Sequence, residues 1–172
     1  MKAANLAPSP RVFEALLQRQ ARDAFARAAT AKDGGALATI GEHLLASTRA
    51  MFKLMRERYS LQPDAACYGA ALMAFAHLRG DHDDRARALR ADMAADGVAA
   101  TLQTETAAAV ALAKAGGGAT LTALFAHIDG MRARGLEPNG VFYNELLRSL
   151  AKYSRSRQRA AAAAAVSAPS ST

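Results

Sequence analysis

Seven basic side chains gather near the C-terminus, where they could bind the phosphates of a nucleic acid. Between Met131 and Thr172 only Glu137 and Glu145 oppose them, so this stretch carries +5 of the formal net charge of +7. Cations at helical spacing form a stripe along one helix face, as phosphate binding requires. A solvated helix face is the alternative interpretation. The phosphate-binding candidates are Arg132, Arg134, Arg148, Lys152, Arg155, Arg157 and Arg159.

The other reactive residue types form no catalytic or cofactor-binding pattern. His77 and His82 flank a predicted helix break, but the sequence positions no third metal ligand, and the aspartates beside His82 predict an N-capping acidic turn instead. Cys67 has no histidine and acid beside it that would make it a nucleophile. The glycines at 116–118 are followed by no Gly-Lys-Ser/Thr, so they predict a turn instead of a phosphate loop. We expect no enzyme activity, metal, cofactor or small-molecule substrate.

The composition favours one domain of close-packed helices. The chain has 172 residues, of which 45 are alanine, the strongest helix former, and none is tryptophan. A single cysteine excludes an internal disulfide framework, and no apolar run is long enough to span a membrane. The basic excess favours an anionic partner.

A sequence repeat at a constant period organises the chain. Met55, Met93 and Met131 lead three similar segments, and the two intervals between them are equal. Further positions of the repeat carry Gly97 with Gly135, Pro63 with Pro138, and the series Tyr68, Glu105 and Tyr143; the first copy has one extra residue before its proline.

Each period divides into two antiparallel helices, which predicts an all-α solenoid of about seven helices. Asp64 and Asn139 are good helix N-caps, and glycines mark the helix ends. We expect hairpins over about 10–58, 64–97 and 102–135 and a terminal helix over 139–158. Residues 1–9 would be a flexible end or a presequence remnant, and 159–172 an Ala/Ser-rich tail.

The repeat resembles that of the pentatricopeptide repeat family. The resemblance covers roughly residues 50–158, and residues 10–50 more weakly. Lys114-Ala-Gly116 is similar to the Lys-x-Gly that ends a helix in that family. The upstream junction repeats the signature with Met55, Pro63, Asp64 and Tyr68. The downstream junction carries it most fully, with Met131, Gly135, Pro138, Asn139, Tyr143 and Asn144.

The resemblance implies binding of single-stranded RNA in an organelle, with one base for each repeat. Carried over, Thr106 with Asn139 resembles a purine-reading pair, expected to select adenine. Asn144 begins a third pair, and Val141 matches a residue that stacks between bases. The first pair is Gly69 with Thr101, in which Gly69 has no side chain to read a base. Tyr153, among the cations, could also stack on a base. One decoded base discriminates by only about 1–3 kcal/mol, too little to select a transcript.

The expected function is therefore an RNA-associated structural subunit of an organellar ribonucleoprotein. A mitochondrial ribosome, with contacts to rRNA and neighbouring proteins, is the host we expect, and a plastid is the alternative location. Two other functions stay open: a protein–protein adaptor without RNA contact, and an organellar transcript-binding factor. The terminal helix should carry an apolar docking stripe, unless the alanine-rich end covers it: Phe142, Leu146, Leu147 and Leu150.

Overall fold

Seven α-helices make up the computed structural model, which describes residues 8–115 and 118–167. Side chains are described for residues 8–114, 120–155 and 158. No strand occurs within these ranges, so the all-α prediction is confirmed. The helices are α1 (Pro10–Thr30), α2 (Gly34–Tyr59), α3 (Ala65–His77), α4 (Asp83–Ala95), α5 (Leu102–Ala115), α6 (Gly118–Ala133) and α7 (Gly140–Ser167).

Short polar side chains cap the starts of α2, α3 and α7, and two of them, Asp64 and Asn139, are the caps that the sequence predicts. Asp64 Oδ1 accepts a hydrogen bond from the Cys67 amide at 2.9 Å, and Asp33 Oδ1 accepts one from Ala36 at 2.7 Å. Asn139 Oδ1 accepts from the Phe142 amide at 3.0 Å. Each contact satisfies one of the amides that a helix leaves unpaired in its first turn.

The three methionines that mark the repeat end their helices in related ways. The carbonyls of Met93 and Met131 accept hydrogen bonds from the amides five residues later, at 3.1 and 3.0 Å. Gly97 and Gly135 allow these turns because they adopt φ of +71° and +76°. In the first copy, which carries the extra residue, Met55 accepts from the amide six residues later at 3.0 Å. The three methionine side chains are buried.

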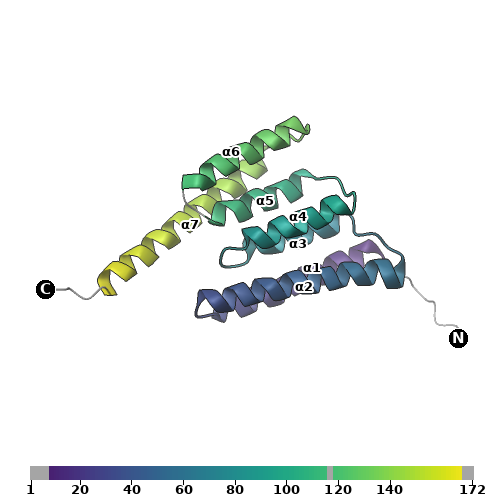
Figure 1. Ribbon diagram of the computed structural model, residues 1–172, viewed down its shortest axis with the longest axis horizontal. Coiled ribbons are helices and arrows are strands. Elements are labelled where there is room, and N and C mark those ends of the chain that lie inside the picture. The colour runs from purple at the N-terminus through teal and green to yellow at the C-terminus, as the bar shows by residue number, and fades with distance from the viewer. Residues whose placement is uncertain (1–7, 116–117, 168–172) are drawn as a thin grey trace.

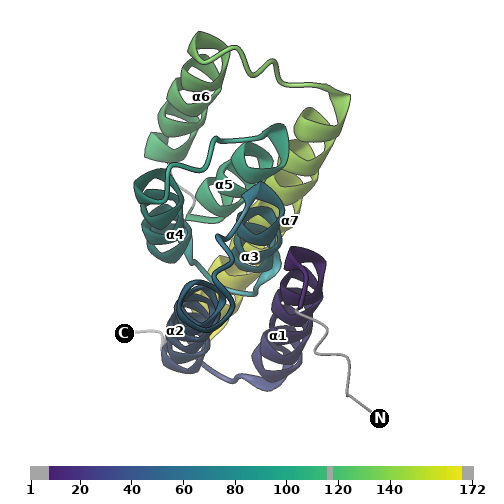
Figure 2. The same cartoon turned by 90° about the vertical axis from the view of Figure 1, so that its right-hand side faces the viewer.

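The hairpins stack into two layers of helices. Helices α1, α3, α5 and α7 contact one another in sequence, and each of the first three also contacts the helix that follows it in the chain. Figure 2 shows α2, α4 and α6 along one side of this row. The stacking carries the chain from the first hairpin at the bottom of Figure 1 to α6 at the top.

Buried alanines let the layers approach closely. Helix α5 lies between α3 and α7 and buries five alanines, because small side chains permit short distances between helix axes. Larger side chains fill the spaces beside it. Phe52, Tyr68 and Phe75 belong to a core shared by α1–α5, while Ile128 and Phe142 belong to a second core around α5, α6 and α7.

Lys114 joins three helices of one layer. Its buried ammonium group donates hydrogen bonds to the carbonyls of Phe75, at 2.9 Å, and Leu78, at the end of α3. A cation stabilises this end because helix carbonyls there are unpaired and carry partial negative charge. The same nitrogen lies 5.5 Å from the centre of the Tyr153 ring on α7. Burial lowers the pKa of Lys114 to about 8.

The terminal helix differs from its expected extent and face. It continues past residue 158 to Ser167, because the six alanines at 160–165 favour helix over a loose tail. Of the predicted docking stripe, Phe142 and Leu146 are buried, Leu150 is partly buried, and only Leu147 is exposed. Residues 1–7, 116–117 and 168–172, which include parts of the predicted N-terminal segment, glycine turn and tail, lie outside the described residues.

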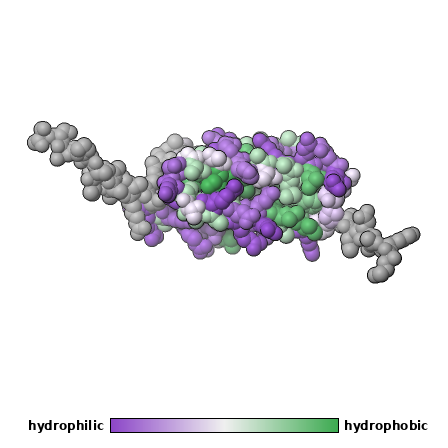
Figure 3. Space-filling model, turned by 90° about the horizontal axis from the view of Figure 1, so that it is seen from below, coloured by the Kyte–Doolittle hydropathy of each residue, from purple (hydrophilic) through white to green (hydrophobic). Residues whose placement is uncertain are grey.

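Several large apolar side chains lie on the surface. Figure 3 views the molecule from the side of α1 and α2, where hydrophobic patches interrupt a mainly hydrophilic face. Among the described residues, no helix combines the length and the apolar character needed to cross a bilayer. The large exposed apolar residues are Val12, Leu16, Leu54, Tyr59, Leu121, Phe125, Val141 and Leu147.

A close contact between Gly41 and His82 gives a stability prediction. A Cβ atom on Gly41 of α2 would lie 2.5 Å from Nδ1 of the buried His82 ring, and the ring is held by a hydrogen bond between its Nε2 and the Arg79 carbonyl at 2.9 Å. We expect Gly41→Ala to lower the free energy of unfolding by about 1–3 kcal/mol, measured by urea denaturation. Gly140→Ala is the control, since a Cβ there meets nothing within 4 Å. Equal stability of both variants would contradict the packing described.

Candidate nucleic-acid interface

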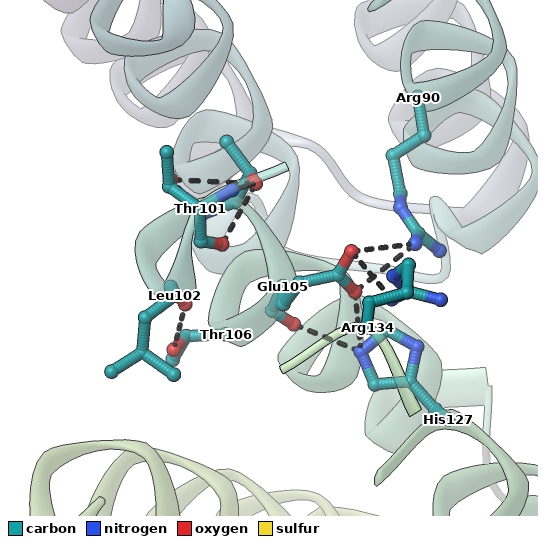
Figure 4. Close-up of polar contacts among 8 residues, drawn as sticks. Arg90, Thr101, Leu102, Glu105, Thr106, His127 and Arg134 are labelled. Carbon is teal, nitrogen blue, oxygen red and sulfur yellow. Dashed lines mark hydrogen bonds and ion pairs between the residues drawn. The ribbon is translucent and has the colours of Figure 1, made fainter. Parts of the chain in front are cut away.

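A buried carboxylate on α5 connects the second hairpin (α3 and α4) to the third (α5 and α6), next to the base-reading candidate Thr106. Glu105, on α5, is only 1% exposed. Its oxygens accept hydrogen bonds from Arg90 of α4 at 3.0 and 3.1 Å and from Arg134, just after α6, at 2.9 Å. His127 of α6 completes the group, with Nε2 at 3.1 Å from the carboxylate (Figure 4). Donors from three segments therefore converge on one acid.

These contacts keep Glu105 ionised. Burial opposes the charged form, but the hydrogen bond from His127 and the charges of Arg90 and Arg134 outweigh it and lower the pKa of Glu105. His127 Nε2 also lies 3.1 Å from the Glu105 carbonyl oxygen. Because both neighbours are acceptors, the hydrogen of a neutral His127 ring belongs on Nε2.

The same two repeat positions form a different pair one period earlier. The Tyr68 hydroxyl donates to Asp96 at 2.5 Å, and Arg56 forms an ion pair with the same carboxylate. Tyr68 and Glu105 share one position of the repeat, while Asp96 and Arg134 are one full period apart and share another. The tyrosine–acid contact of the first junction thus becomes an acid–arginine contact at the second.

The predicted base-reading pair is occupied by local backbone contacts. Thr106 is 8% exposed, and its hydroxyl donates to the Leu102 carbonyl at 2.6 Å (Figure 4). Asn139 is exposed, and its side-chain oxygen caps α7. Neither group is held by the other, so the structure presents an exposed amide and a covered hydroxyl at these positions.

The remaining base-contact candidates lie on α7. Val141 and Asn144 are exposed near its start. Tyr153 is partly buried, and its ring has Lys114 Nζ at 5.5 Å and Lys152 Nζ at 5.7 Å. Tyr153 therefore already has cations beside its ring and offers only part of its surface for stacking on a base.

The phosphate-binding candidates separate into two groups. Arg148, Lys152 and Arg155 are exposed, and their spacing of four and three residues places them on one face of α7. Arg148 also contacts Glu145 at 3.0 Å. Arg132 and Arg134 lie at the end of α6, where Arg134 binds Glu105 and Arg132 lies near acids. The side chains of Arg157 and Arg159 lie outside the described residues.

Sequence reasoning missed the Glu105 group. One signal was present, because an acid at a position occupied twice by tyrosine indicates altered chemistry at that junction. Arg90 and His127 carried no such signal, since their contact with Glu105 exists only after the helices stack. Among the residues described, no set of three or more His, Cys, Asp and Glu side chains could hold a metal ion.

The Glu105 contacts predict acid-dependent stability. The folded pKa of Glu105 is lowered from 4.5, so its stabilisation is complete above the unfolded value and is lost as the pH falls through the folded value. We expect Glu105→Gln to cost about 3 kcal/mol at neutral pH and to reduce the loss of stability in acid, both measured by urea denaturation. The exposed Glu57→Gln is the matched control. An unchanged acid dependence in Glu105→Gln would contradict this assignment.

Comparison with known proteins identifies the fold. No protein-family model matches the sequence, and no curated protein matches it. Among solved structures, the chain is similar to the crystal structure of the pentatricopeptide repeat protein PPR10 from maize, with a TM-score of 0.57 and 15% sequence identity. The match covers 96% of this chain and 20% of that one, so the chain spans about a fifth of the length of PPR10. The chain thus folds as a pentatricopeptide-repeat-like α-solenoid.

Proposed function

We propose that the chain binds single-stranded RNA through the cationic face of α7 and serves as a structural subunit of an organellar ribonucleoprotein. The observation that carries the proposal is the row of exposed Arg148, Lys152 and Arg155 along one face of the last helix. Val141 is exposed on the same side, seven residues before Arg148, and can pack against a base. The pentatricopeptide-repeat-like fold supports this proposal.

The proposed binding is directed at the RNA backbone more than at its sequence. A base-reading side chain needs a free donor or acceptor at the surface, whereas Thr106 is covered and its hydroxyl donates to the backbone. Gly69 offers no side chain, and Gln103 lies against it, with side-chain atoms 3.2 Å from where a Cβ would be. A protein of this kind suits RNA that other subunits already hold, and a mitochondrial ribosome is the host we propose.

A specific observation favours the adaptor alternative. Leu121 and Phe125 on α6 and Leu147 on α7 are more than half exposed, and apolar side chains in such positions mark surfaces that bind proteins. A transcript-binding factor is the third candidate. If it is correct, substitution of Thr106 and Asn139 changes which RNA sequences the protein prefers.

The RNA proposal predicts a defined salt dependence. Each phosphate neutralised on a single strand contributes about −0.7 to the slope of log K against log salt concentration. Replacing Arg148, Lys152 and Arg155 with alanine should weaken binding to poly(A) and poly(U) alike and make the slope shallower by about 2. Fluorescence anisotropy over a series of salt concentrations measures both quantities.

A matched control separates placed charge from net charge. Arg11, Arg19 and Arg22 are exposed on α1, so their triple alanine variant loses the same charge elsewhere. Equal weakening by the two triple variants, or unaltered binding in the α7 variant, would contradict the α7 interface. No RNA binding by the unmodified chain would leave the adaptor function. Sedimentation of the native protein from an organelle lysate tests the host, since a ribosome-sized particle that shifts after ribonuclease treatment is expected.

A further inference from the structure

Helices α2, α4 and α6 form the outer layer of the solenoid. The contact between α2 and α4 shows how one outer helix binds the next. Arg49 of α2 binds Asp92 of α4 at 2.7 Å. Further along, Arg56 of α2 pairs with Asp96, the residue just after α4, and the Tyr68 hydroxyl donates to the same carboxylate at 2.5 Å. The end of α4 therefore meets the preceding hairpin through Asp92 and Asp96, which are four residues apart and lie on the same side because Asp96 keeps a helical conformation.

The last outer helix repeats this receiving face two periods later. Arg132 of α6 occupies the position of Arg56 two periods on, and Tyr143 of α7 corresponds to Tyr68. As at the first junction, the arginine and the tyrosine lie together, with Arg132 donating to the Tyr143 hydroxyl at 3.3 Å. The acid in the earlier group comes from the following outer helix. Among the described residues no outer helix follows α6, which lies at the edge of its layer (Figures 1 and 2).

The rest of this face changes from charged to apolar. Leu121 and Phe125 occupy the positions of Leu45 and Arg49 two periods later. At 54% and 66% exposure they are among the most exposed apolar side chains of the described residues. Where α2 binds an acid through Arg49, α6 presents a phenylalanine ring, so a helix received here needs an apolar residue in place of Asp92.

We propose that this end of the solenoid binds an amphipathic α-helix of another protein, seated on α6 as α4 is seated on α2. An apolar residue of the partner helix packs on Leu121 and Phe125. Four residues later, an Asp or Glu accepts hydrogen bonds from Arg132 and Tyr143. Leu147, one turn after Tyr143 on α7 and also exposed, extends the apolar part of the surface.

Arg132 is suited to this role because its present ion contacts are weak. Its guanidinium lies 3.8 Å from Asp129 and 3.9 Å from Glu137, and both acids are at least three-quarters exposed. Exposed pairs at such distances contribute little, so a carboxylate brought in by a docked helix can replace them. The inference is independent of RNA binding by α7, since it does not use the cations of that face.

Selection from a phage-displayed library of helical peptides on the full chain tests the proposal. Counter-selection uses the chain with Phe125→Ser and Arg132→Gln. We expect enriched peptides to carry an apolar residue followed four positions later by Asp or Glu. The best of them should bind the unmodified chain at least about tenfold more tightly than either single variant. Leu54→Ser and Arg58→Gln, exposed on α2, are matched controls and should leave binding unchanged.

Three results would overturn the proposal. The library yields no peptide that prefers the unmodified chain, or the enriched peptides lack the carboxylate, or the controls weaken binding as much as the α6 variants. A concentration-dependent dimer that Phe125→Ser abolishes would show instead that a second copy of the chain occupies the surface. Misfolding does not confuse these outcomes, because Phe125 and Arg132 are exposed and the unfolding transition of each variant checks its fold.

Discussion

A carboxylate held by donors from several helices sets how each hairpin of this solenoid sits on the next. An ionised acid is costly to bury, and only charged hydrogen bonds of good geometry offset that cost. Glu105 is buried and meets the requirement with Arg90, His127 and Arg134, while Asp96 lies at the surface and binds Arg56 and Tyr68. The alanine faces between the helices allow close approach, but such apolar contacts do not determine how one helix is rotated relative to the next. The hydrogen bonds to the acids are directional, and they determine which side of each outer helix faces its neighbour.

Much of the fold could be predicted from local signals in the sequence. The spacing of Met55, Met93 and Met131 indicated the stacked hairpins, and Asp64 and Asn139 indicated helix starts, because caps act within a few residues. The Glu105 group could not be predicted, since its partners come from positions that meet only when α4, α5 and α6 are stacked. The covered state of Thr106 was also hidden, because the sequence does not reveal that its hydroxyl donates to the backbone.

The proposed surfaces follow from where the stack ends. Helix α7 is the last described helix of its layer, and its exposed cations Arg148, Lys152 and Arg155 suit a phosphate backbone. Helix α6 closes the other layer, so its apolar side has no following helix within the described residues. Leu147 and Arg148 are neighbours in sequence, yet they point about 100° apart around α7. The two proposed surfaces therefore do not compete for the same face of α7.

The central claim is that the Tyr68–Asp96 and Glu105–Arg134 contacts are two versions of one junction. The most direct test transfers the first version to the second place, by urea denaturation of Glu105→Tyr, Arg134→Asp and the double variant. We expect each single change to destabilise the protein and the double variant to recover about 1–3 kcal/mol relative to the sum of the two. Strictly additive effects would contradict the claim, because they would mean that the two positions do not act as a pair.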